Sequence, residues 1–174
     1  MVARRPLKPF VQVRILAPQP NMTKFTTTVK YIVDQSTKLK NDFTDDKKAP
    51  VEFGCIFCQN DEEYQYFSKE IKSDGKIVED TKSGFTYLLN EPIETVSGPL
   101  RLVKIRKPDL NRLERGDADF NTSYPAFKKK YKNNPKFELV TRDDSEMLRL
   151  SDQSFDVMAC FSKIPKSSNL GIKL

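Results

Sequence analysis

Two basic side chains in the stretch 100–107 could hold a small anion. Apolar and basic residues alternate there as they do in a β-strand, and Lys104 and Arg106 lie two residues apart. Side chains two apart in a strand point to the same face, so an ammonium and a guanidinium would together meet a carboxylate or phosphate. Arg101 has the opposite parity to Lys104 and would join them only if the strand bulges.

Two carboxylates, Asp117 and Asp119, follow in the next predicted strand. If that strand lies beside the first, the aspartates can form ion pairs with Lys104 and Arg106, and the charges are then structural. Alternatively these side chains line a cleft and bind a small ligand. Both interpretations rest on the same candidates for ligand binding, which are Arg101, Lys104, Arg106, Asp117 and Asp119.

The composition removes several kinds of chemistry. The 174 residues include no histidine, which excludes imidazole as a catalytic base or metal ligand. No serine or threonine has a histidine partner, and no G-x-S-x-G or glycine-rich phosphate loop occurs. The sequence predicts no catalytic residue and no cofactor, and an enzymatic role is the weaker expectation. No stretch approaches the ~18 uncharged apolar residues of a membrane span.

The cysteines favour a cytoplasmic location. Cys55, Cys58 and Cys160 are an odd set without a disulfide framework, which is typical of a reducing compartment. Cys55 and Cys58 have the C-x-x-C spacing of some redox and zinc sites. They lie in an apolar run that reads as a strand, where positions i and i+3 face opposite sides, so ordinary buried thiols are the favoured interpretation.

The formal charge of +6 is distributed unevenly. Residues 1–21 carry four basic residues and no acid, whereas from Met22 onward 26 basic against 24 acidic residues leave +2. The leader 1–21 is either a basic arm for an acidic partner or an upstream sequence before a working start at Met22, and the second is favoured. The cluster Lys128-Lys129-Lys130-Tyr131-Lys132 could touch nucleic acid, although a lysine run on a helix is more often a solvated face.

The rest of the chain predicts an N-terminal helix and two copies of one element order. Residues 23–41 have the apolar spacing of a helix, so 22–48 is a helix and linker ahead of the main domain at 49–174. The order β-α-β-β-β then occurs at 50–108 and again at 115–163. A half-module cannot bury its sheet alone, so the two copies should form one α+β fold. The predicted ranges are strand 52–58, helix 60–74, strands 76–80, 85–89 and 100–107, then strand 116–121, helix 124–132 and strands 137–141, 146–150 and 155–162.

Several short stretches carry a family resemblance. They are residues 75–78, residues 85–93 with the step Asn90-Glu91-Pro92, residues 102–108 ending in proline, and residues 112–120 with Gly116 before a strand. Together with the paired β-α-β-β-β order, they resemble the YecM-like branch of the vicinal oxygen chelate superfamily, the glyoxalase and bleomycin-resistance proteins. The resemblance covers residues 50–122 well and the remainder through element order. It implies a glyoxalase-like mixed-sheet fold.

The resemblance also implies positions for a divalent metal. The family holds it with four side chains, typically histidines and glutamates, and the metal polarises paired oxygens of a small substrate. Three of these positions fall near Phe53, Lys104 and Asp119. Phenylalanine has no donor atom and lysine repels a cation, so at most one of the three keeps ligand chemistry. The resemblance therefore implies a member of the superfamily that has lost its metal ligands.

The sequence as a whole predicts a glyoxalase-like protein that binds a small anion or carboxylate without a metal. Two alternatives stay open. One is a metal-dependent lyase, isomerase or dioxygenase-type enzyme of the same fold, and the other is a basic protein associated with nucleic acid. A small molecule is the expected partner, nucleic acid is the weaker expectation, and no membrane is expected.

Overall fold

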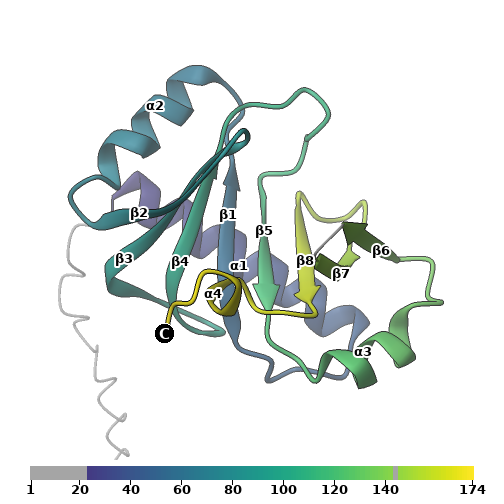
Figure 1. The fold of residues 1–174 in the computed structure, drawn as a ribbon. Coiled ribbons are helices and arrows are strands. Elements are labelled where there is room, and N and C mark those ends of the chain that lie inside the picture. Colours follow the sequence, from purple (N-terminus) through teal and green to yellow (C-terminus); the bar gives the residue numbers. More distant parts are fainter. Residues whose placement is uncertain (1–22, 143–144) are drawn as a thin grey trace, which may run out of the picture.

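The computed structural model describes residues 23–142 and 145–174, so the leader 1–21 lies outside the described residues. The elements follow the predicted order (Figure 1). An N-terminal helix, α1 (Lys24–Phe43), precedes two modules. The first comprises β1 (Val51–Phe57), α2 (Asp61–Glu70), β2 (Gly75–Thr81), β3 (Gly84–Thr95) and β4 (Gly98–Arg106). The second comprises β5 (Gly116–Phe120), α3 (Tyr124–Tyr131), β6 (Phe137–Arg142), β7 (Ser145–Leu150) and β8 (Val157–Ser162), and a short helix α4 (Lys166–Asn169) follows.

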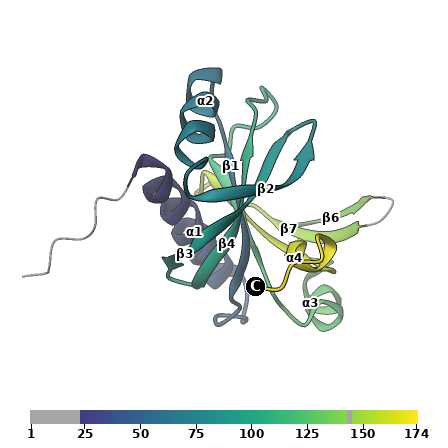
Figure 2. The ribbon, with the colours of Figure 1, turned by 60° about the vertical axis from the view of Figure 1, so that its left-hand side comes forward.

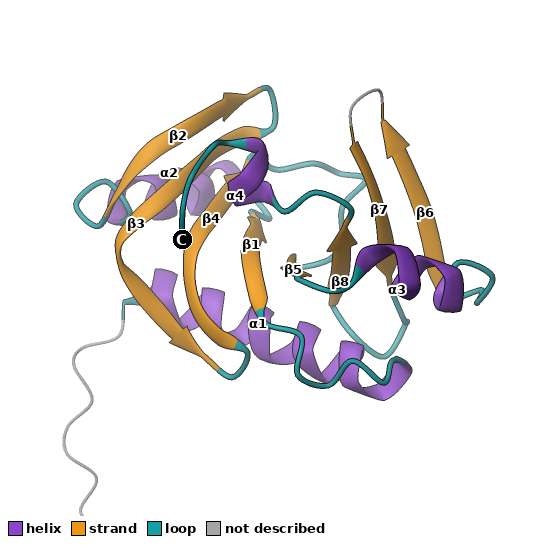
Figure 3. Ribbon diagram, turned by 60° about the horizontal axis from the view of Figure 1, so that its bottom comes forward, coloured by secondary structure: helices purple, strands orange, loops and turns teal. Residues whose placement is uncertain are grey.

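Within the described ranges the strands form one mixed sheet of eight, in the order β2-β3-β4-β1-β5-β8-β7-β6. Each module places its first strand parallel to its last, β1 beside β4 and β5 beside β8. An antiparallel pair of β1 and β5 joins the two halves, which are arranged alike on either side of it. The sheet is strongly curved, with α1 and α2 on its outer face and α4 over its inner side (Figures 2 and 3). The predicted α+β class with paired modules is confirmed.

Strand β5 shows how the sequence builds the two faces of the sheet. Its alternate residues Ala118 and Phe120 pack in the apolar core on the outer face, which α1 covers. The residues between them, Asp117 and Asp119, face the inner side. The core therefore lies between the helices and the sheet, and the polar side chains of the central strands gather on the opposite face.

Helix α1 is attached to both modules. Its predicted apolar face is buried, with Ile32 and Val33 almost wholly inaccessible. The Ser36 hydroxyl donates a hydrogen bond of 2.8 Å to the carbonyl oxygen of Met158 in β8, and the hydroxyls of Thr37 and Ser97 lie 2.8 Å apart before β4. The helix thus crosses beneath the junction of the two halves.

The structure differs from the predicted ranges at the ends of several elements and in one additional helix. Helix α2 ends at Glu70 rather than at residue 74. Strand β3 continues to Thr95 rather than ending at residue 89, because an irregularity between Leu88 and Ile93 accommodates Pro92 and pairing resumes at Ile93 with Leu100. Strand β8 begins at Val157 rather than at residue 155. Helix α4 was not predicted. Among the helices of residues 23–142 and 145–174, none is both long enough and apolar enough to cross a bilayer.

Gly116 is required by the close packing of α1 on the sheet. A Cβ at this position would lie 2.2 Å from the backbone oxygen of Cys55 and 2.7 Å from Cδ1 of Ile32. We expect Gly116→Ala to lower the free energy of unfolding by about 2–3 kcal/mol, measured by urea denaturation, because the backbone must shift to make room. In the control Gly54→Ala the new methyl group meets a Leu100 methyl at 3.1 Å, which can move, so the loss should be smaller. Equal losses would contradict this account.

Candidate functional site

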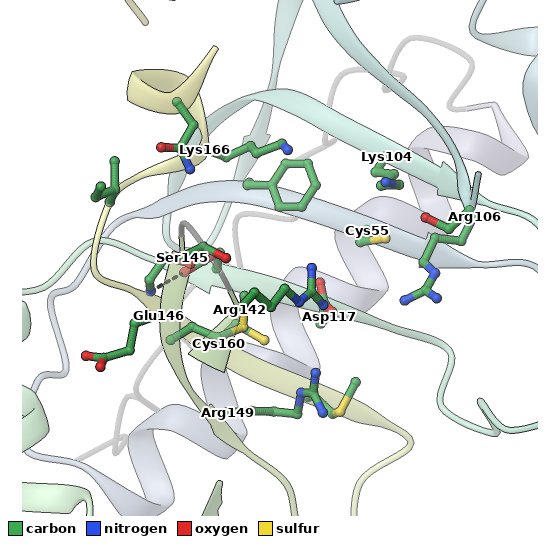
Figure 4. A pocket seen from close by; sticks show the side chains of 18 of the residues that line it. Cys55, Lys104, Arg106, Asp117, Arg142, Ser145, Glu146, Arg149, Cys160 and Lys166 are labelled. Atoms are coloured by element: carbon green, nitrogen blue, oxygen red, sulfur yellow. Dashed lines mark hydrogen bonds between the residues drawn. The ribbon is translucent and has the colours of Figure 1, made fainter. Parts of the chain in front are cut away.

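A cavity of about 230 Å³ lies on the inner face of the sheet, where the two modules meet. Strands β1, β4, β5, β7 and β8 supply most of its lining, and the C-terminal segment with α4 borders it (Figure 4). Its lining is strongly charged, and among the described residues basic side chains outnumber acidic ones by six to three. The basic residues are Lys104, Arg106, Arg112, Arg142, Arg149 and Lys166, and the acidic residues are Asp117, Asp119 and Glu146.

One row of cross-strand neighbours brings a cation and a carboxylate into this cavity. Lys104 of β4 pairs with Cys55 of β1, and Cys55 pairs with Asp117 of β5. The row ends at Met158 of β8, which pairs with Asp117. Neighbouring strands lie about 4.8 Å apart, so the Cα atoms of Lys104 and Asp117 are separated by about two strand spacings.

The adjacent row brings in the second aspartate and an arginine that the sequence did not single out. Phe53 of β1 pairs with Asp119 of β5, and Asp119 pairs with Cys160 of β8. Cys160 in turn pairs with Arg149 of β7. The strand order therefore places residues of both modules side by side on the floor of one cavity.

Lys104 and Arg106 face the cavity without the aspartate partners that the structural interpretation required. The Lys104 ammonium donates to the Thr81 hydroxyl at 2.8 Å, and burial lowers its pKa. The Arg106 guanidinium lies over the ring of Phe57, 4.9 Å from its centroid, and 3.8 Å from the Asp109 carboxylate. Within the described part of the chain, neither cation forms an ion pair with Asp117 or Asp119.

The two aspartates have different surroundings. Asp119 is 6% exposed, and its carboxylate accepts hydrogen bonds from the backbone N–H of Ser162 at 3.1 Å and from the Ser162 hydroxyl. Burial raises the pKa of Asp119 to about 7 against the opposing effect of these bonds. Burial also raises the pKa of Asp117 to about 6, with Arg149, Arg106 and Arg112 acting in the opposite direction. Asp117 has no hydrogen bond or ion pair with any residue that the structure describes.

Four of the five candidates from the sequence line the cavity, and Arg101 does not. Its guanidinium donates to the backbone oxygens of Leu89 at 3.0 Å and Asn90 at 3.4 Å in the neighbouring strand β3. The candidate Arg101 therefore lies outside this cavity, and its guanidinium links β4 to β3. The alternation of side chains in β4 explains this position. Lys104 and Arg106 share one face of the strand, and Arg101 has the opposite parity.

Three further arginines line the cavity and were missed. Arg149 alternates with the buried Leu148 and Leu150 in β7, so its face could have been predicted, but its position next to Cys160, two strands from Asp119, depends on the strand order. Arg112 belongs to the loop before β5, with its guanidinium 6.0 Å from the centroid of the Phe57 ring. Arg142 ends β6. No pattern in the sequence indicates where these two side chains meet the others.

The C-terminal segment is fixed over the cavity by Glu52. The register of β1 against β5 shifts between Val51 and Phe53, a β-bulge that allows Glu52 and Phe53 to lie on the same side. The buried Glu52 carboxylate accepts from the backbone N–H groups of Lys166 at 3.1 Å and Ser167 at 2.6 Å. The Lys166 ammonium also pairs with Glu79 of β2 at 2.5 Å.

The other predicted motifs have structural surroundings. Cys55 lines the cavity while Cys58 packs in the outer core, the opposite sides that a strand predicts, and burial raises the pKa of both thiols. In the lysine run on α3, Lys128 pairs with Glu146 and Lys130 with Asp45. The ring of Tyr131 in the middle of this run packs in the core and offers no free stacking surface.

The side chains at the positions implied for a metal do not suit one. Phe53, Lys104 and Asp119 do line a single cavity, as the resemblance implies. Phe53 offers no lone pair, the Lys104 ammonium repels a cation, and both Asp119 oxygens accept hydrogen bonds from Ser162. In the ranges that the structure covers, no cluster of three or more histidine, cysteine, aspartate or glutamate side chains could hold a metal ion.

The paired modules and the curved mixed sheet define an α+β protein built from two similar halves. A solved structure described as structural genomics protein EC4020 is similar, with a TM-score of 0.66 and 9% identity over 84% of this chain and 90% of that one. A glyoxalase/bleomycin resistance protein/dioxygenase superfamily member from Vibrio splendidus 12B01 aligns with a TM-score of 0.37 and 9% identity over 66% of this chain and 98% of that one, which is too distant to carry an argument. At such identity the first likeness concerns the fold alone. No protein-family model and no curated protein matches the chain.

Proposed function

We propose that the inner cavity binds a small anion, without a metal, through Lys104 and Arg106. The observation that carries the proposal is that both cations face the cavity with donor capacity to spare. Lys104 bonds a neutral hydroxyl, and Arg106 has the Asp109 carboxylate at 3.8 Å, beyond hydrogen-bonding distance. Partly buried donors of this kind are stabilised by an acceptor, and a carboxylate or phosphate supplies one.

We also propose that the chain is a divergent cytoplasmic protein of the vicinal oxygen chelate superfamily, in its YecM-like branch, which has lost its metal ligands. The paired modules support this assignment, as does the meeting of Phe53, Lys104 and Asp119 in one cavity. The three buried cysteines are free thiols, which supports a reducing compartment.

Calorimetric titration with sulfate and with propanoate at pH 6 tests the anion site. We expect saturable binding, and we expect Lys104→Gln and Arg106→Gln each to weaken it about tenfold or more, because each removes a charged donor. Lys107→Gln is the matched control, since Lys107 is exposed directly after the same strand, and the affinity of this variant for each anion should stay within about twofold of the unaltered protein. Absence of binding by the unaltered protein, or equal losses in all three variants, would contradict the proposal.

A further inference from the structure

Among the described residues, Asp117 is the acidic group of the cavity that has no hydrogen-bond or ion-pair partner. It lies in the row between Lys104 and Met158 and is half-buried in the lining (Figure 4). The other aspartate, Asp119, already accepts two hydrogen bonds from Ser162. In the described part of the structure no donor reaches Asp117. A carboxylate in this setting is stabilised when a bound molecule donates a hydrogen bond to it.

The surrounding charges decide what kind of donor is suitable. Arg106, Arg112 and Arg149 are all close enough to Asp117 to act on its charge. A ligand ammonium at this position would be repelled by three guanidinium groups, whereas a neutral hydroxyl would not. The same guanidinium groups, together with Lys104, attract the anionic part of the ligand.

We infer that the ligand is a small hydroxylated anion, a hydroxy-carboxylate or a hydroxyalkyl phosphate, whose hydroxyl group donates to Asp117. This inference rests on the proposed anion site, and it adds Asp117 as the side chain that distinguishes hydroxylated anions from others. The cavity of about 230 Å³ corresponds to roughly seven or eight water molecules, which suits a chain of three or four carbons with its charged group. The partly buried ring of Phe53, the buried ring of Phe57 and the buried thioether of Met158 line the cavity and offer apolar contact for the carbon atoms.

Calorimetric titration at pH 8 with matched probes tests the inference. Glycerol 3-phosphate is compared with propyl phosphate, and glycerate with propanoate, so that each pair differs in its hydroxyl groups. We expect the hydroxylated member of at least one pair to bind about tenfold to a hundredfold more tightly, as a hydrogen bond to a charged group provides. The two pairs distinguish a phosphate from a carboxylate as the anionic group. Glycerol alone should not bind.

Variants of Asp117 assign the preference to this side chain. Asp117→Ala should bind the hydroxylated probe no more tightly than the matched probe without hydroxyl groups. Its affinity for propyl phosphate or propanoate should be unchanged or higher. Asp117→Asn keeps a neutral acceptor and should retain an intermediate preference. Asp80→Ala, at an exposed position on β2, is the control and should leave both affinities unchanged.

The possible failures are distinguishable. Equal affinities of the unaltered protein for both members of each pair would overturn the hydroxyl inference and leave the anion site standing. Failure of every probe to bind would overturn both. A preference that survives in Asp117→Ala would remove Asp117 from the recognition of the hydroxyl group. The comparison of probes on the unaltered protein is decisive even if a variant fails to fold.

Discussion

Replacing Asp119 with asparagine should make the protein more stable at pH 8. The carboxyl is 6% exposed and burial raises its pKa to about 7 in the folded state, against about 3.9 in an unfolded chain. The folded state therefore binds a proton more tightly than the unfolded chain does, and the free energy of unfolding falls as the pH rises from about 4 to about 7. Above pH 7 the buried charge costs on the order of 3–4 kcal/mol. Asparagine removes the charge, and its amide can still accept from the Ser162 N–H.

Urea denaturation at pH 8, 6 and 4 measures this effect. We expect the free energy of unfolding of Asp119→Asn to exceed that of the unaltered protein by about 2–4 kcal/mol at pH 8, and the difference to disappear near pH 4. Asp80→Asn changes an exposed aspartate on β2 and should alter stability by less than about 0.5 kcal/mol. A less stable Asp119→Asn at pH 8 would mean that the hydrogen bonds from Ser162 outweigh the cost of burying the charge.

Sulfate binding should tighten about tenfold or more as the pH falls from 8 to 5.5. The pKa of Asp119 is about 7 and that of Asp117 about 6, so both carboxyls take up protons in this interval and stop repelling a bound anion. At an effective dielectric constant of about 20, a like charge within a few ångströms costs several kcal/mol, enough for such a change. Sulfate keeps its own charge throughout the interval.

A titration series from pH 8 to 5.5 with three variants assigns the effect. Asp117→Asn combined with Asp119→Asn should bind sulfate tightly at pH 8 and show little dependence on pH, with each single variant in between. Because the sequence has no histidine, no imidazole contributes in this range. A pH dependence that persists in the double variant would contradict this account and would belong to another group.

The faces of the strands could be predicted from the sequence because alternation is a local property. The pattern of Gly116–Phe120 separates apolar from acidic positions, and the spacing of Lys104 and Arg106 places both on one face. The structure confirms these placements. The element order could be predicted for the same reason, since each helix and strand is encoded in its own short stretch.

The assembly of the cavity could not be predicted, because it depends on which strands are neighbours and in what register. Cys160 of β8 lies between Asp119 of β5 and Arg149 of β7, and in the sequence α3 and β6 separate β5 from the other two strands. Arg112 comes from a loop, whose course the sequence does not predict. The β-bulge at Glu52 moves that side chain to the inner face, where it anchors the C-terminal segment, and no local sequence pattern indicates this bulge. Strand parity also allowed ion pairs of Lys104 and Arg106 with the two aspartates. They do not form among the described residues, because the direction of each side chain is not determined by parity.

The attachment of α1 to both modules has a consequence for the dynamics of binding. A helix that packs beneath the junction, with Ser36 bonded to one half and Thr37 to the other, opposes any hinge motion between them. Ligand entry then depends on rearrangements of the rim, such as the loop at 107–115 that carries Arg112, on the nanosecond-to-microsecond timescale. Since the walls are already in place, binding should cost little conformational entropy, and selectivity rests on the fixed positions of the charges rather than on closure around the ligand.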